Sequence, residues 1–99
     1  MPPKPAIAWF PKKGFAVLRA AQADAGQIPA RWEDWRQNLE HQLQQLGRVL
    51  EDCTRVDLEL IPLRHFCDVK GIPMDSRGRS LFAATVAAVV AQQRRSSEH

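Results

Sequence analysis

The chain has 99 residues, of which 44% are hydrophobic and 25% are charged, a composition typical of one ordinary globular domain and not of a disordered chain. No apolar run approaches the roughly 20 residues needed to cross a bilayer, and the proline-broken start, "MPPKPAIAWF", lacks the form of a secretory signal. We therefore expect a cytoplasmic protein, with no membrane partner, whose Cys53 and Cys67 stay reduced.

The net charge of +3 conceals an uneven distribution of charged side chains. Residues 1–30 hold four basic side chains and one acidic one, residues 31–68 hold five and eight, and residues 69–99 hold five and two. An acidic middle between two basic ends attracts a protein surface of opposite charge as readily as it attracts a nucleic acid. The charge distribution alone therefore leaves both partners open.

The first 14 residues contain four prolines and three lysines, a density that disfavours the interior of helices and sheets. Within them "AIAWF" (6–10) is either a short strand or an arm that packs Trp9 and Phe10 on the core. We favour a docked arm, because two bulky aromatic side chains are rarely left in solvent. From Pro11 the apolar spacing predicts a helix that runs to Gly26. We divide the chain into a docking arm over 1–14, one globular domain over 15–95 and a frayed tail over 96–99.

The strongest periodic signal is a helix predicted over residues 30–46. Apolar residues recur there every three or four positions, which is helical spacing: Trp32, Trp35, Leu39, Leu43, Leu46, Leu50 and Cys53. Gly47 either ends this helix in a left-handed conformation or is carried through it at a cost of about 1 kcal/mol.

The next segment, "TRVDLELIP", alternates and predicts a half-buried strand. Val56, Leu58 and Leu60 share its apolar face, whereas Arg55, Asp57 and Glu59 share the other. A strand needs a hydrogen-bonding partner, and the sequence offers three: "AIAWF", "RVL" (48–50), or a second copy across a two-fold axis.

Two further helices complete a mainly helical α+β fold, with about four helices and one or two short strands in a single small domain. Pro62 suits the first position of a helix that Gly71 ends. Asp75 or Ser76 suits the N-cap of the last helix. We expect the densest apolar face of that helix to comprise Leu81, Phe82, Thr85, Ala88 and Val89.

The order of "IPARWEDW", a leucine-striped helix, "LRHFCDVKG" and "DSRGRSLFAA" resembles a family of small uncharacterised bacterial proteins of unknown function. Its pattern is a Leu-Pro-x-x-aromatic-x-x-Trp helix start, an acidic strand, a Trp/Phe-Cys helix and an Arg-x-x-Phe-Ala helix. The resemblance covers residues 28–88, supports a strand followed by a helix over 55–70, and implies no activity. A strand before two helices is also similar to the ribbon-helix-helix fold, whose strands would present Arg55, Asp57 and Glu59 to DNA. Two of these three side chains repel phosphate, so we do not favour this fold.

"HFCDVKG" (65–71) is the one stretch that places a histidine close to a cysteine. In a helix, residues two positions apart point about 200° apart, so His65 and Cys67 cannot hold one metal ion. Cys67 shares the apolar side with Leu63, and a buried thiol is a poor nucleophile. We predict no metal site, no cofactor and no catalytic residue, and hence no enzyme.

Six residues are candidates for binding a partner: Trp32, Trp35, Arg77, Arg79, Arg94 and Arg95. The tryptophans either pack in the core, which we favour, or anchor a partner. The arginines lack interleaved aromatic residues of the kind that stack on bases, which favours a protein contact. We interpret the chain as a small non-enzymatic interaction module, a homodimer or an accessory subunit. The alternative is a nucleic-acid-binding regulator that uses its basic N-terminal arm and C-terminal helix.

Overall fold

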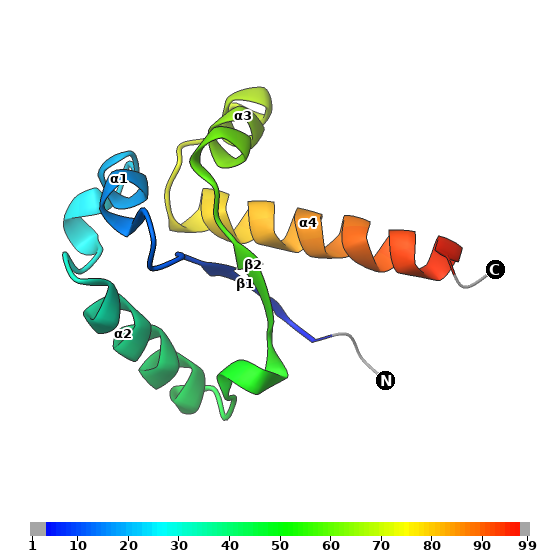
Figure 1. The fold of residues 1–99 in the computed structure, drawn as a ribbon, viewed down its shortest axis with the longest axis horizontal. Helices are drawn as coiled ribbons and strands as arrows, with labels where there is room; N and C mark the ends of the chain where they lie inside the picture. The colour runs from blue at the N-terminus through cyan, green and yellow to red at the C-terminus, as the bar shows by residue number, and fades with distance from the viewer. Residues whose placement is uncertain (1–3, 98–99) are drawn as a thin grey trace.

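A small parallel sheet and four helices make up the structure, a computed structural model that describes the backbone of residues 4–97 and the side chains of residues 4–94. The elements follow in the order β1 (Ala6–Trp9), α1 (Phe15–Ala20), α2 (Trp32–Gln45), β2 (Thr54–Asp57), α3 (Leu60–Lys70) and α4 (Ser76–Ser97). Figure 1 shows α4 crossing the two strands, with α2 and α3 well apart from each other. The predicted mainly helical α+β fold in a single small domain is confirmed.

The two strands lie side by side in parallel, with Ala6 opposite Thr54 and Trp9 opposite Asp57. Of the three partners that the sequence offers β2, the chain uses "AIAWF". Our preference for a docked arm over the alternative of a short strand is therefore wrong, because the backbone of residues 6–9 finds its hydrogen-bond partners in a distant strand. The expected burial of Trp9 and Phe10 is confirmed.

The first helix, α1, is much shorter than the predicted span 11–26. It begins only after Gly14, whose φ of 78° is left-handed. At its other end the buried side chain of Gln22 turns inward, and the backbone N–H of Ala23 donates to the carbonyl of Met74 at 2.8 Å. Contacts with a loop far along the chain thus take the place of further helical turns.

The striped helix predicted over 30–46 is confirmed as α2, and Gly47 ends it. Gly47 has a φ of 71°, and the N–H of Arg48 donates to the carbonyl of Leu43 at 2.8 Å. With a second bond from the N–H of Gly47, this makes a Schellman motif. The stripe therefore does not continue as helix, and Leu46 at its end is 72% exposed.

The alternation predicted after residue 53 is confirmed in and beyond β2, where Val56 and Leu58 are buried between exposed neighbours. The strand is shorter than predicted, because α3 already begins two residues before Pro62. Gly71 ends α3 in a left-handed conformation (φ 69°), as its position predicted.

The last helix, α4, has the predicted N-cap. The carboxylate of Asp75 accepts a hydrogen bond from the N–H of Gly78 at 3.0 Å, an interaction that stabilises a helix by about 1 kcal/mol. The backbone remains helical to Ser97, beyond the start of the predicted frayed tail, and residues 98 and 99 lie outside the described part of the chain.

The predicted apolar face of α4 is wrong by part of a turn. Phe82 is buried as predicted, but Leu81 and Val89 of the predicted face are 46% and 48% exposed, and Ala83, which was not part of that face, is buried. The cause is the close approach of the preceding loop to Gly78, which turns the side of the helix with Gly78 and Phe82 toward the core. Hydrophobicity alone does not identify that side, because it includes a glycine.

The two strands place different side chains on the two faces of the sheet. Ala8 and Val56 pack in the core cluster with Phe82 from α4. Trp9, on the opposite face, packs edge-on against Trp35 of α2. The sheet thus lies between α2 and α4.

Candidate functional site

Trp32 and Trp35 both pack against the N-terminal strand. The ring centroid of Trp35 lies 5.2 Å from that of Trp9 and 5.2 Å from that of Phe10, in edge-to-face geometry. The indole N–H of Trp32 donates to the carbonyl of Phe10 at 2.7 Å, which ties the start of α2 to the end of β1. The favoured packing interpretation is confirmed, and a role in anchoring a partner stays a prediction.

The arginines predicted on α4 do not form one surface. Arg79 is buried, with 8% of its surface exposed, whereas Arg77 and Arg94 are exposed. The side chain of Arg95 lies outside the described residues. Arg79 is therefore held inside the fold, and only Arg77 and Arg94 are placed as solvated cations on this helix.

A bidentate ion pair holds Arg79 to Asp24, in the loop between α1 and α2. The two guanidinium N–H groups donate to the two carboxylate oxygens at 2.7 and 2.9 Å, and Nη1 also donates to Gln22 at 3.0 Å. The side chains are only 10% and 16% exposed. The hydrogen bonds from Arg79 lower the pKa of the Asp24 carboxyl, against the opposing effect of burial. The carboxyl of Asp24 is therefore ionised at neutral pH.

The histidine and cysteine of "HFCDVKG" diverge as predicted. Cys67 is 2% exposed and belongs to the core cluster, whereas His65 is exposed on the outer side of α3. Burial raises the pKa of the Cys67 thiol, which leaves less of the reactive thiolate. These two residues do not form a joint site.

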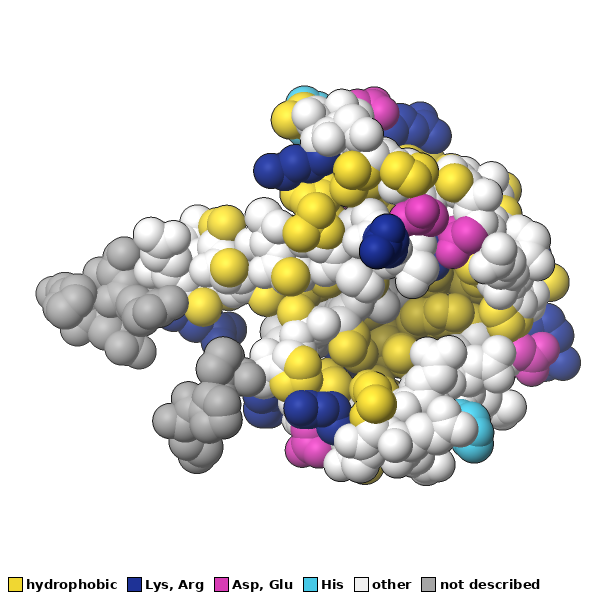
Figure 2. Space-filling model, turned by 180° about the vertical axis from the view of Figure 1, so that it is seen from behind, with side chains coloured by type: hydrophobic (Ala, Val, Ile, Leu, Met, Phe, Trp, Pro, Cys, Tyr) yellow, Lys and Arg dark blue, Asp and Glu magenta, His cyan; other side chains and the backbone are white. Residues whose placement is uncertain are grey.

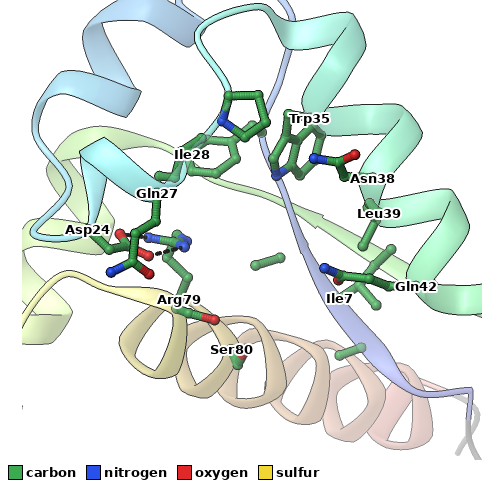
Figure 3. A pocket seen from close by; sticks show the side chains of 15 residues that line it. Ile7, Asp24, Gln27, Ile28, Trp35, Asn38, Leu39, Gln42, Arg79 and Ser80 are labelled. Carbon is green, nitrogen blue, oxygen red and sulfur yellow. Dashed lines mark hydrogen bonds and ion pairs between the residues drawn. The ribbon is translucent and has the colours of Figure 1, made fainter.

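A groove of about 420 Å³ runs along β1 between α2 and α4, and we call it the edge groove. Its floor includes Ala6, Ile7 and Ala8, three consecutive residues whose side chains alternate between the faces of the sheet. A groove lined by all three follows the edge of the strand and not one of its faces. Figure 3 shows β1 passing between the two helices, with the Asp24–Arg79 pair at one end. In Figure 2 the surface is hollowed near its centre, with hydrophobic side chains on the floor.

The walls of the edge groove are mainly neutral. From α2 come Trp35 and Leu39, together with the amides of Asn38 and Gln42. From α4 and the loop after α1 come Ser76, Ser80, Gln27, Ile28, Pro29 and the Asp24–Arg79 pair. Because the two charged groups are bonded to each other, the lining carries no net formal charge.

The backbone of β1 on the groove side lacks a partner strand in the described residues. In the ladder with β2, the N–H of Thr54 donates to the carbonyl of Pro5 and that of Leu58 to the carbonyl of Trp9. Parallel pairing uses alternate residues, so the odd-numbered residues of β1 face β2. The N–H and C=O groups of Ala6 and Ala8 therefore point away from β2, toward the groove.

A second groove, of about 1040 Å³, lies between the strands and the later turns of α4. Its floor is apolar, with Val86 and Val90, and its rim carries Lys4, Arg55 and Arg94 against a single acid, Asp57. We call it the basic groove.

The two grooves divide the predicted partner-binding residues. Trp35 and Arg79 line the edge groove, and Arg94 lines the basic groove. The groove-facing edge of β1 was not predicted from the sequence, and neither were the polar side chains of Asn38, Gln42 and Ser80. Five consecutive uncharged residues between Pro5 and Pro11 were the available signal for an uncharged strand edge.

Comparison of the chain with models of known families, with curated proteins and with solved structures finds no match in any of the three. Among the described side chains, those of residues 4–94, no three from His, Cys, Asp or Glu gather closely enough to bind a metal ion. Among the helices of that same part, none combines the length and apolar character required to span a bilayer. The geometry of the two grooves is therefore the main evidence on function.

Proposed function

We propose that this protein is a small, non-catalytic interaction module that binds a partner polypeptide in the edge groove. The observation that carries the proposal is the groove itself, which has a strand edge as its floor and two helices as its walls. Ligand sites are typically concave, with apolar surfaces and a few placed polar groups. Trp35 and Leu39 supply the apolar surface, and amides and hydroxyls supply the polar groups.

The charged groups of the edge groove support binding over acid–base catalysis. Asp24 and Arg79 satisfy each other through two hydrogen bonds, and the pKa of Asp24 is lowered, not raised toward neutrality. A general acid or base works best with a pKa near the ambient pH. The pair is instead suited to holding the wall of the groove and keeping it neutral.

The test is a selection of displayed random eight-residue peptides on the full chain, followed by measurement of affinity. The groove variant Gln42→Arg/Ser80→Arg places a new charge on each wall, and we expect affinity for the selected peptides to fall at least about tenfold. The control Gln44→Arg/Thr85→Arg adds the same charges to exposed positions on the same helices, outside the groove lining. Equal affinity for the two variants would show that the groove is not the binding site.

Self-association is the second form that this function can take. The sequence suggested a homodimer, since basic and acidic segments alternate along the chain. Light scattering over a wide range of protein concentration measures it. A mass that doubles with concentration in the parent protein, but not in the groove variant, assigns the dimer contact to the edge groove. A chain that stays monomeric and also selects no peptide contradicts the proposal.

One observation favours the alternative of nucleic-acid binding: three basic side chains, Lys4, Arg55 and Arg94, gather on the rim of the basic groove. Three phosphate contacts give a salt dependence of affinity with a slope of about −2 to −3 on logarithmic axes. Fluorescence anisotropy with duplex and single-stranded DNA at low salt tests this alternative. Absence of binding, or binding unchanged in Arg94→Ala, removes it.

A further inference from the structure

The two outer edges of the sheet differ in how they are protected from other strands. An open edge invites pairing with another chain, and proteins usually defend it with charged side chains, proline or a covering element. The outer edge of β2 carries exposed Arg55, Asp57 and, just beyond the strand, Glu59. β1 carries no charged residue along its length, and its edge instead lies inside the edge groove.

The free groups on the edge of β1 are those that an added strand requires. Ala6 and Ala8 each present a backbone N–H and C=O toward the groove, and no described residue forms a hydrogen bond with them on that side. The next groove-facing carbonyl, that of Phe10, already accepts the indole N–H of Trp32 at 2.7 Å. The open stretch is therefore short, and it ends at a defined point.

The sheet has only two strands among the described residues, and it therefore depends on the helices packed against it. Parallel sheets are normally buried on both faces, and three strands or packing against helices are needed for stability. Here α2 and α4 both extend past β1, and they form the two walls of the groove. They therefore provide covered space on both faces for one more strand beside β1.

We infer that the edge groove binds an extended, uncharged segment of a partner protein as a third strand beside β1. This inference rests on the proposed function and names its partner chemistry and binding mode. Strand addition combines main-chain hydrogen bonds with pockets for alternate side chains. The bound segment forms its main-chain bonds with Ala6 and Ala8.

The walls define the side chains of the segment. Those that point to α2 meet Trp35 and Leu39, which favour apolar groups. Those that point to α4 meet Ser76 and Ser80, which favour small polar groups. A charged side chain would lose its hydration without gaining a free counter-charge, because Asp24 and Arg79 neutralise each other. The favoured ligand alternates apolar and small polar residues over about four positions, the length of β1.

The experiment measures hydrogen exchange of the backbone amides by NMR, with the full chain and the best of the displayed eight-residue peptides. We expect the amides of Ala6 and Ala8 to exchange at least about tenfold more slowly when the peptide is bound. The amides of Ile7 and Trp9 face β2 and serve as internal controls, because their bonds exist in both states. N-methylation of every second peptide residue is the complementary test. One of the two alternate sets is expected to weaken binding at least tenfold, and the other set by less than about twofold.

The possible failures are distinguishable. If peptides bind in the groove without slowing amide exchange at Ala6 and Ala8, strand addition is wrong, whereas the proposed function as an interaction module is still supported. Selection of charged peptides overturns the predicted partner chemistry. If the amides of Ala6 and Ala8 become more protected as protein concentration increases, without any peptide, the edge of β1 binds a second copy of the chain. That result overturns the inference that the groove binds a segment of a partner protein. If no peptide is selected and the chain stays monomeric, both the inference and the proposed function fail.

Discussion

Replacement of the buried ion pair tests whether the wall of the edge groove also stabilises the fold. Arg79→Met keeps most of the length of the side chain but removes the charge, and leaves the carboxylate of Asp24 only 16% exposed. Asp24→Asn keeps the shape and removes the opposite charge. Loss of one member of a buried pair typically costs 3–5 kcal/mol, because the other charge remains buried without its partner. We therefore expect each single variant to lower the free energy of unfolding by about 3 kcal/mol.

The interaction between the two residues is measured by the double variant. Opposite charges about 4 Å apart attract by about 4 kcal/mol at an effective dielectric constant of about 20, and part of this is offset by desolvation. Two hydrogen bonds of 2.7 and 2.9 Å hold the pair in good geometry. We therefore expect a coupling free energy of about 2 kcal/mol between Arg79→Met and Asp24→Asn.

Urea unfolding followed by tryptophan fluorescence provides the four free energies of unfolding. Trp9 and Trp35 lie in the packed aromatic cluster and report loss of the fold. The control is Arg77→Met, an exposed arginine in the first turn of the same helix, which we expect to change stability by less than about 0.5 kcal/mol. A coupling below about 0.5 kcal/mol is the value of a surface pair, and it would refute our account of Arg79 as a buried wall residue.

The same pair predicts a dependence of stability on pH. The folded protein lowers the pKa of Asp24 below its ordinary value of 3.8, chiefly through the hydrogen bonds from Arg79. A lowered carboxyl pKa stabilises the fold at pH values above 3.8, and this contribution is lost as the pH falls through the folded-state pKa. The difference in stability between the parent protein and Asp24→Asn should therefore narrow from about pH 5 downward. A difference that stays constant over that range contradicts the ionised pair.

Three further predictions concern glycines and a thiol. Gly78→Ala should destabilise the fold by about 2 kcal/mol despite better helix propensity, because the new Cβ would lie 2.5 Å from the carbonyl oxygen of Pro73. In the same urea assay Gly26→Ala, with no atom within 4 Å, is the control, and equal effects would contradict the close contact. Gly47→Ala should lower the free energy of unfolding by about 1 kcal/mol, because alanine is strained in the left-handed conformation of this residue. An unchanged urea midpoint would contradict this strain. Iodoacetamide should alkylate Cys67 at least about tenfold more slowly in the folded protein than in urea, and equal rates by mass spectrometry would contradict its burial.

The features that could be predicted from the sequence are those fixed by neighbouring residues. Gly47 and Gly71 end helices because a left-handed residue is needed directly after the last turn. Asp75 caps α4 because its carboxylate reaches an N–H three residues on. The alternation around Val56 predicted a strand because side chains in a strand alternate between its two faces. Each of these signals acts within one or two turns of the chain.

The features that were missed depend on contacts between distant segments. β1 forms only because β2, more than 40 residues later, provides its hydrogen-bond partners, whereas Trp9 and Phe10 alone indicated only an arm docked on the core. The helix α1 stops where the loop around Met74 provides other hydrogen bonds. Arg79 was predicted as one of several exposed arginines on α4, because no residue near it in the sequence indicates that it pairs with Asp24.

The edge groove belongs to this second kind of feature, because three separate segments create it. Its polarity also depends on the distant pair: with either charge removed, the wall would present an unpaired ion to any segment that enters. A buried ion pair is often no more stabilising than an apolar replacement, so stability alone gives weak grounds for one at this position. A wall that must be polar yet neutral beside an open strand edge provides a stronger reason. The stability of the fold and the proposed binding of an uncharged segment therefore both require the ion pair between Asp24 and Arg79.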